Sequence, residues 1–261
     1  MHPTIIFIHG MFLTGKSWDK WVRFFEQRGY RCLAPSWPLH DGEPAQLRAS
    51  IPEGTGELSL EMVINHYARI AIAERVKPIF IGHSVGGLVV QRLIAGGLGQ
   101  AGVCISSVAP NKMLSLDWDF LRNSAMIANP FKGDVPVEMT PEGFHKNFAN
   151  TMSREASDAA WNEFAVHESR NVLRDCLGKD GQIDLTLPHA PLLFLAGDSD
   201  RIVPDELNQK NARAYTDERS ITDFTEFPGR GHYLCGQSGW EDLAHRAAIW
   251  LTAHAQPAMA A

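Results

Sequence analysis

The residue best placed for chemistry in this sequence is Ser84, in the segment 82–87 (GHSVGG). An apolar run at 78–81 predicts a buried strand before it, and the pattern at 87–94 predicts a helix after it. Such a tight turn has no room for neighbouring side chains, so Gly-x-Ser-x-Gly suits a strained serine whose hydroxyl stands above a sheet. The five-residue pattern also occurs in ordinary turns, so the flanking strand and helix are what favour a nucleophile.

A serine hydroxyl is a weak nucleophile at neutral pH and needs a base, a carboxylate that orients the base, and donors for the developing oxyanion. We predict His232 as the base, because it lies in a glycine-rich loop after a predicted strand at 223–227. The carboxylate follows a predicted strand at 191–196, where two aspartates compete. Asp200 is favoured because one more turn of loop brings it toward His232. Asp198 is the alternative, or else a turn former that binds its own backbone.

Two backbone N–H groups are predicted to bind the oxyanion. Val85 follows the serine at the start of a helix, where the helix dipole favours negative charge. The second donor should come from the loop after the first predicted strand, at 4–8. Met11 is favoured there and Phe12 is the alternative, while Gly10 permits a close approach.

Two histidines beside these residues are predicted to be structural. His9 braces the loop that follows the first strand. His83 is the immediate neighbour of Ser84 and should point away from it, toward packing or a local hydrogen bond.

Strand patterns alternate with helix patterns along most of the chain, which predicts a mostly parallel sheet with helices on both faces. The predicted strands are 4–8, 31–35, 78–81, 103–108, 191–196 and 223–227. The predicted helices of this part are 18–28, 60–70, 87–94, 205–215 and 238–253. The last of them is expected to begin with a capping box, Ser238-x-x-Glu241, and residues 38–58 are expected to form a loop.

From about 111 to 186 the pattern is helical, with no convincing strand. One helix should begin at Thr140, and a second should run through Trp161 to Leu173. We predict that this segment is inserted over the sheet, and that some of its apolar side chains line a pocket while most of them only pack. The predicted substrate contacts are Phe144, Phe148 and Trp161, together with Phe12. Further candidates for the pocket lining are Met113, Trp118, Phe120, Met126, Phe131, Met139, Met152 and Phe164.

The motifs occur in the order Ser, Asp, His and closely resemble those of the α/β-hydrolase superfamily. The resemblance rests on His9-Gly10, the turn at 82–86, Gly-x-x-Asp-x-x-Val-Pro at 197–204, and Gly231-His232. It points to the small, cofactor-free esterase and lipase branch, in which a helical cap covers the pocket. It therefore implies an α/β-hydrolase fold with a core of residues 1–110 and 187–261, a cap of residues 111–186, and no cofactor. The chain departs from the family pattern in two ways. It opens on the strand that the family numbers as its third, and it lacks a Gly-Gly-Gly run in the oxyanion loop.

These features predict a serine hydrolase that cleaves a small-to-medium carboxylic ester with an apolar part. A lactone, thioester or amide would use the same groups. A second hypothesis is a non-hydrolytic enzyme of the same fold: a perhydrolase, a lyase or a cofactor-free oxygenase. A ligand-binding receptor that retains these residues is a third.

Composition narrows the range of partners. The net charge is −6 and no cluster of Lys and Arg is visible, which argues against nucleic acid or an anionic membrane as the main partner. No apolar stretch is long enough to span a bilayer. The four scattered cysteines and the lack of a secretory signal lead us to expect a cytoplasmic protein with free thiols. No metal-ligand spacing is evident, and the oligomeric state is left open.

Overall fold

The computed structural model describes residues 3–115, 117, 122 and 128–255. Within this part of the chain, six parallel strands form one sheet in the order β2-β1-β3-β4-β5-β6. The strands are β1 (Thr4–Ile8), β2 (Arg31–Leu33), β3 (Ile79–His83), β4 (Ala101–Ile105), β5 (Leu192–Gly197) and β6 (Thr222–Phe227). Strands β1, β3, β4 and β5 are buried along their whole length, as expected for a parallel sheet covered on both faces.

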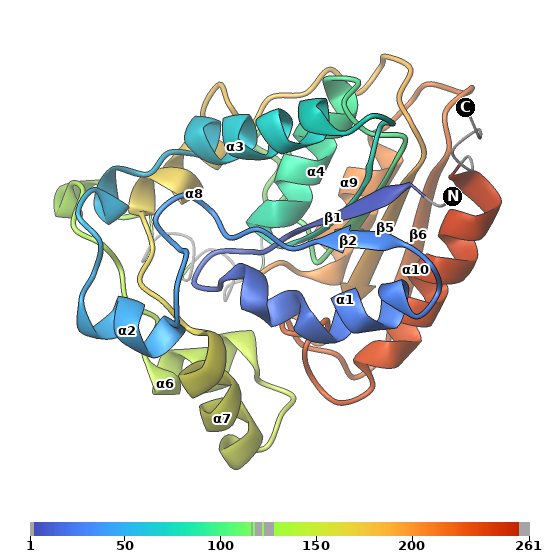
Figure 1. Ribbon diagram of the computed structural model, residues 1–261. Helices are drawn as coiled ribbons and strands as arrows, with labels where there is room; N and C mark the ends of the chain where they lie inside the picture. The colour runs from blue at the N-terminus through green and yellow to red at the C-terminus, as the bar shows by residue number, and fades with distance from the viewer. Residues whose placement is uncertain (1–2, 116, 118–121, 123–127, 256–261) are drawn as a thin grey trace.

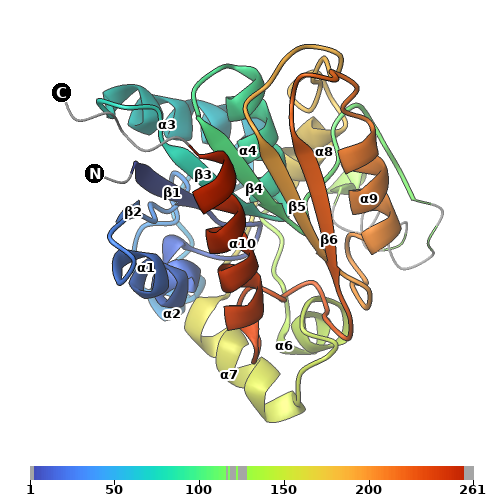
Figure 2. The same ribbon diagram turned by 90° about the vertical axis from the view of Figure 1, so that its right-hand side faces the viewer.

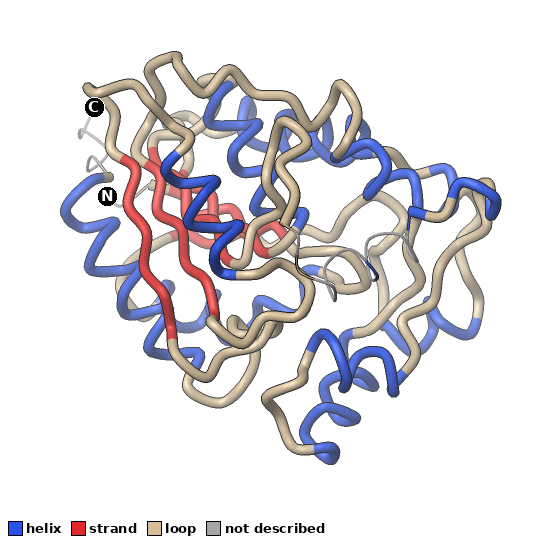
Figure 3. The backbone as a smooth tube through the Cα atoms, turned by 180° about the vertical axis from the view of Figure 1, so that it is seen from behind, coloured by secondary structure: helices blue, strands red, loops and turns tan. Residues whose placement is uncertain are grey.

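Helices cover both faces of this sheet (Figures 1 and 3). One face carries α1 (Asp19–Glu26) and α10 (Trp240–His254), and the other carries α3 (Leu60–Ala73), α4 (Val85–Ala95) and α9 (Asp205–Arg213). The predicted α/β-hydrolase architecture is confirmed.

The order of strands reverses between β1 and β3, because the chain goes from β1 outward to β2 and then returns to the other side. In open parallel sheets, ligands bind beyond the carboxyl ends of the strands at such a switch point. The turn after β1 and the turn after β3, which carries Ser84, both lie at this point.

A long connection joins β4 to β5 and contains α6 (Pro141–Gly143), α7 (Arg154–Phe164) and α8 (Arg170–Cys176). The helix that starts at Thr140 continues past α6 as a π-helical turn, Phe144–Phe148. Both α6 and α7 lie beyond the carboxyl ends of the strands (Figure 2). Of the sequence-predicted pocket candidates, Trp118, Phe120 and Met126 lie outside the described residues.

The prediction of one helix through Trp161 to Leu173 is wrong, because α7 and α8 are two separate helices. Between them the chain is extended, and Glu168 forms an antiparallel bridge with Val137. The two backbone bonds of this bridge, 2.8 and 2.9 Å, satisfy the polar groups of Glu168 without a helix.

Three other boundaries also differ from expectation. The expected loop at 38–58 contains α2 (Pro44–Ala49) and a short 3-10 turn, Thr55–Glu57. Strand β4 ends at Ile105, since Ser106 has a φ of 41° and leaves the extended conformation. The predicted capping box is wrong: α10 begins at Trp240 after Gly239, whose φ of 78° suits glycine, and no side chain caps it.

Candidate active site

Ser84 occupies the strained turn between β3 and α4. Its φ is 56° and its ψ is −120°, values that a residue with a side chain rarely adopts. Added Cβ atoms would lie 2.2 Å from the Gly86 carbonyl oxygen at Gly82, and 2.3 Å from the Ile8 carbonyl oxygen at Gly86. Only glycine fits at these two positions, which explains the spacing of the motif.

His232 and Asp200 form a buried pair. His232 Nδ1 lies 2.8 Å from Asp200 Oδ2, and the two side chains are 1% and 0% exposed. The other carboxylate oxygen accepts the N–H groups of Ile202 and Val203 at 2.8 and 2.9 Å. His232 Nε2 is buried and has no hydrogen-bond partner in the part of the chain that the structure describes. With Nδ1–H directed at Asp200, this second nitrogen can accept a proton.

The competing carboxylate contacts other groups. Asp198 Oδ1 accepts the Gly229 N–H at 2.7 Å and the Ser199 hydroxyl at 2.9 Å, and its side chain is exposed. Asp198 therefore ties the loop after β5 to the loop after β6. Of the two aspartates, Asp200 is the one that the fold pairs with His232.

The loop after β1 lies directly against the serine. A Cβ at Gly10 would be 2.9 Å from Ser84 Cβ, so no larger residue fits. His9 braces the loop, because its Nε2 accepts the Trp37 N–H at 2.9 Å and its ring stacks on Trp37. Burial lowers the pKa of His9 well below its ordinary value, and the nearby His40 lowers it further.

The two predicted donors in this loop differ in their contacts. The Phe12 N–H already donates to Glu168 Oε2 at 3.3 Å. The N–H groups of Met11 and Val85 have no acceptor among the described residues. Of the three predicted donors, the amides of Met11 and Val85 are therefore the ones that no described acceptor occupies.

Sequence comparison decides the family. A sequence model described as the alpha/beta hydrolase family matches residues 5–246 of this chain. The chain belongs to the alpha/beta hydrolase family. Non-heme chloroperoxidase from Burkholderia pyrrocinia is 29% identical to this alpha/beta hydrolase over an alignment of 237 residues, and the match covers 77% of this chain and 75% of that protein.

Solved structures show the same fold. The monoacylglycerol lipase of Paleococcus ferrophilus superposes on this alpha/beta hydrolase with a TM-score of 0.69 at 18% identity, over 97% of this chain and 95% of the lipase. A pyrethroid hydrolase from Sphingobium faniae gives a TM-score of 0.68, also at 18% identity, over 96% and 98% of the two chains.

In this alpha/beta hydrolase, His83 supports the loop of His232. His83 Nε2 lies 2.8 Å from the His232 carbonyl oxygen and so donates to it, and the two rings lie 4.7 Å apart. Burial, and then the neighbouring His232, lowers the pKa of His83 to about 3. The ring is therefore neutral, and its hydrogen bond goes to a residue far away in the sequence, whereas the sequence led us to expect packing or a local bond.

The four aromatic residues predicted to contact substrate lie in different surroundings. Phe148 is 4.9 Å from the His232 ring and stacks on Phe144 at 4.8 Å. Phe12 is buried in the loop after β1. Trp161 lies under the Arg48 guanidinium at 4.5 Å, where α7 packs on α2. Of the four, Phe148 is the one with a measured ring contact to His232, and the contact of all four with substrate stays a prediction.

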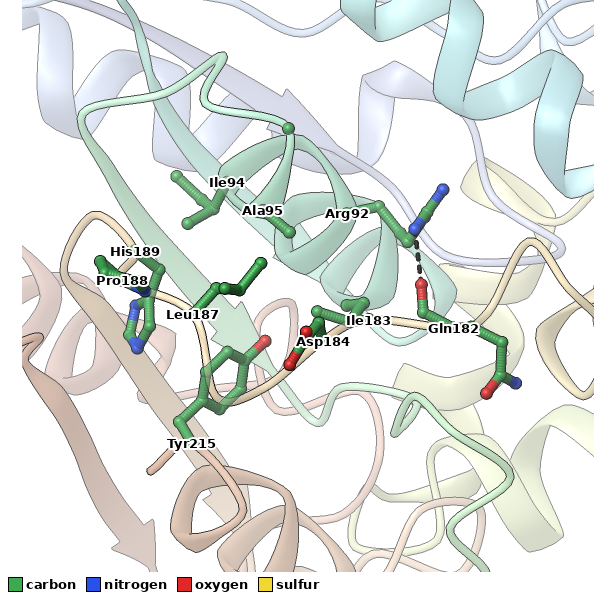
Figure 4. Close-up of a pocket in the computed structure, with 11 residues that line it drawn as sticks. Arg92, Ile94, Ala95, Gln182, Ile183, Asp184, Leu187, Pro188, His189 and Tyr215 are labelled. Carbon is green, nitrogen blue, oxygen red and sulfur yellow. Dashed lines mark hydrogen bonds between the residues drawn. The ribbon is translucent and has the colours of Figure 1, made fainter. Parts of the chain in front are cut away.

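A separate pocket of about 310 Å³ opens between the end of α4, residues 182–189 and Tyr215 (Figure 4). The hydrogen bond from Arg92 to the Gln182 carbonyl oxygen lies at its edge. None of the predicted site residues lines it, so we assign it no part in the chemistry of Ser84.

Sequence reasoning missed Glu168 and His40. Glu168 is fully buried and binds the loop after β1, with His40 Nε2 3.4 Å from its carboxylate. The segment around Glu168 (AVHES, 165–169) mixes apolar and polar residues, so the sequence carried no local signal for a buried carboxylate there. The described residues contain no group of three or more metal-ligating side chains, and no described helix is long and apolar enough to cross a membrane.

Proposed function

We propose that this alpha/beta hydrolase is a serine hydrolase that cleaves a small-to-medium carboxylic ester with an apolar part through an acyl-enzyme on Ser84. The observation that carries the proposal is a buried His232–Asp200 pair, whose His232 Nε2 has no hydrogen-bond partner among the described residues, in a fold that also holds Ser84 in a strained turn. The two amides without acceptors, on Met11 and Val85, supply the oxyanion donors that acyl transfer requires.

The reaction follows from these positions. Ser84 Oγ attacks the carbonyl carbon of the ester while His232 Nε2 takes the hydroxyl proton, and Asp200 stabilises the imidazolium. His232 then gives this proton to the departing alcohol. In the second half, His232 takes a proton from water as the hydroxide adds to the acyl-enzyme, and collapse releases the carboxylic acid while His232 returns the proton to Ser84 Oγ.

We further propose that residues 111–186 form a cap over a core of residues 1–110 and 187–261. Phe12, Phe144, Phe148 and Trp161 are proposed contacts for the apolar part of the substrate. The support is strongest for Phe148, whose ring packs against His232 at 4.9 Å.

A fluorophosphonate probe tests the nucleophile. We expect it to label the wild type on the peptide that contains Ser84, and not to label Ser84→Ala. Ser106→Ala is the matched control, because Ser106 is also a buried serine with positive φ after a strand. It should label like the wild type. A wild-type protein that takes up no probe contradicts the proposal.

The ester class is tested with p-nitrophenyl esters of increasing acyl length, alongside lactones, thioesters and anilides. We expect a burst of p-nitrophenol equal to the enzyme concentration when deacylation is slower than acylation. Preference for a lactone or an anilide over every ester would replace the ester assignment and keep the nucleophile.

The chloroperoxidase similarity favours perhydrolysis as a second candidate. Hydrogen peroxide in place of water would attack the acyl-enzyme and release a peracid and free Ser84. Peracid formation from acetate and hydrogen peroxide at a rate above that of ester hydrolysis, absent in Ser84→Ala, would assign this reaction.

A further inference from the structure

A carboxylate with no role in the proposed reaction lies behind the oxyanion loop. Glu168, on the connection between α7 and α8, is 0% exposed. Its Oε1 accepts the Ser169 N–H at 2.8 Å and its Oε2 accepts the Phe12 N–H at 3.3 Å. Acidic side chains are almost never fully buried unless they are paired, so this placement calls for a functional or structural reason.

The same segment also holds the other end of Phe12. The Val166 N–H donates to the Phe12 carbonyl oxygen at 3.0 Å, two residues before Glu168. The segment is itself fixed, because Glu168 and Val137 exchange two backbone hydrogen bonds. Phe12 has a φ of 66°, a left-handed conformation that costs a phenylalanine energy and persists only where the surroundings enforce it.

We propose that Glu168 is a positioning residue for the oxyanion site. Its carboxylate oxygen holds the Phe12 N–H, which fixes the Met11–Phe12 peptide and leaves the Met11 N–H free for the substrate oxyanion. The inference rests on the proposed serine hydrolysis. If Glu168 has this role, the segment between α7 and α8 completes a site whose other residues follow the strands of the sheet.

His40 lies beside this carboxylate. Its Nδ1 faces the Pro38 carbonyl oxygen at 3.1 Å, and its Nε2 faces the His167 carbonyl oxygen at 3.2 Å and Glu168 at 3.4 Å. Burial raises the pKa of Glu168, while His40 and the two backbone N–H groups oppose that rise.

Two variants separate the effect of the hydrogen bond to the Phe12 N–H from the effect of the negative charge of Glu168. Glu168→Gln keeps the reach and an acceptor oxygen for the Phe12 N–H but removes the charge. Glu168→Asp keeps the charge but shortens the side chain by one methylene, which withdraws the acceptor. We expect Glu168→Asp to lower kcat by about 10- to 100-fold with little change in KM. A misplaced donor weakens the binding of the transition state but not the binding of the substrate. Glu168→Gln should retain most of kcat.

A transition-state analogue supplies the readout that a merely structural role would not move. A trifluoromethyl ketone forms a tetrahedral oxyanion on the nucleophile, so its inhibition constant should rise in Glu168→Asp by the same factor as kcat/KM falls. Asp175→Asn is the matched control, because Asp175 also accepts a backbone N–H from another element, that of Leu60 at 3.1 Å. Its kcat and inhibition constant should match those of the wild type.

The outcomes distinguish the two proposals. A wild type that neither takes up the fluorophosphonate nor hydrolyses esters defeats the proposed function. If the wild type does both and Glu168→Asp keeps wild-type kcat and inhibitor affinity, the positioning role alone is wrong. It is equally wrong if Glu168→Gln and Glu168→Asp lose kcat to the same extent. Should Glu168→Asp not fold, Glu168→Met takes its place, because it keeps the length of the side chain but has no acceptor oxygen: a tenfold rise of its inhibition constant with Glu168→Gln unchanged supports the role, and an unchanged constant in Glu168→Met overturns it.

Discussion

Asp200 and Asp198 are two residues apart, yet their carboxylates bind different groups. Asp200 accepts from His232 and two backbone amides, whereas Asp198 accepts from Gly229 and Ser199. An orienting carboxylate selects the imidazole tautomer whose free nitrogen can take a proton. Only Asp200 is in a position to do this for His232.

We expect Asp200→Asn to lower kcat for an ester by about 10³- to 10⁴-fold, because an amide N–H facing Nδ1 favours the wrong tautomer of His232. Asp198→Asn keeps an oxygen for the Gly229 N–H and should leave kcat close to that of the wild type. Steady-state kinetics on both variants decide between the aspartates, and the reverse order of effects would move the orienting role to Asp198.

His83 makes stability depend on pH. Its pKa in the folded protein is about 3, against 6.5 for an ordinary histidine. Between these values the unfolded chain binds a proton at this site and the folded chain does not. Stability therefore falls as the pH drops from about 6.5 toward 3, by at most about 1.4 kcal/mol per pH unit from this residue.

His83→Gln removes this titration and keeps an N–H for the His232 carbonyl oxygen. We expect the free energy of unfolding in urea, measured between pH 4 and 7, to fall less steeply with acid in the variant than in the wild type. Equal slopes would show that His83 does not cause the acid sensitivity.

At the scale of elements, the site depends on how closely the turns after β1 and β3 approach each other. A Cβ at Gly10 would lie 2.9 Å from Ser84 Cβ and 3.1 Å from the His83 carbonyl oxygen. Neither atom is the end of a flexible side chain, so the backbone of one turn has to move. Such a movement displaces the oxyanion donors from the serine.

We expect Gly10→Ala to lower kcat by about 10²-fold, the typical cost of misplacing reacting groups by about 1 Å. Gly96→Ala is the control, since a Cβ there meets its nearest atom at 3.4 Å and the φ is −75°. Kinetics combined with urea denaturation test this. A Gly10→Ala protein with wild-type kcat would show that the two turns can accommodate a methyl group without displacing the reacting groups.

The β4–β5 connection holds loops on two sides of the site. Its first half binds the loop after β6, through the Phe148 carbonyl oxygen that accepts the Tyr233 N–H at 2.9 Å and through Thr151, which accepts the Gly231 N–H at 3.2 Å. Its second half, at 166–168, binds Phe12 in the loop after β1. The connection therefore holds both the loop of His232, the proposed base, and the loop of Met11, the proposed oxyanion donor.

The sheet was predictable from sequence because buried parallel strands are short apolar runs that end at turns, as at 78–81 before Ser84. The pairing of His232 with Asp200 followed from the same logic, since all strand ends meet at one edge. The break at 165–169 was not predictable. Its bridge partner, Val137, is distant in sequence, and a buried glutamate gives no local signal. The start of α10 was missed because Ser238 and Glu241 imitate a capping box.

At the scale of the whole molecule, the connection and the sheet share one core. Phe144, Phe148, Val172 and Cys176 from the connection belong to the same buried cluster as Cys104 and its neighbours in the sheet. A segment that shares its apolar core with the sheet buries little apolar surface within itself, and this is too little to make it fold separately. We therefore expect the connection and the sheet to unfold together.

The four cysteines can report on this expectation. Cys104, Cys176 and Cys235 are buried in β4, in α8 and in the loop before α10, while Cys32 is partly buried. Burial raises the pKa of every one of these thiols, to about 12 for Cys32 and Cys235, so the folded protein contains little thiolate. A thiol reagent attacks the thiolate, and it should therefore react slowly until the chain opens.

We expect iodoacetamide labelling in increasing urea, located by peptide mass, to reach Cys104 and Cys176 at the same midpoint, because one cooperative unit exposes both. Cys32→Ser removes the partly buried thiol and should leave this shared midpoint in place. Labelling of Cys176 at a lower urea concentration than Cys104 would show that the connection opens before the sheet. The loops of His232 and Phe12 would then lose their supports while the strands were still folded, and the proposed esterase activity would disappear when Cys176 loses its protection. With a shared core, activity and the protection of both cysteines should instead end at the same urea concentration.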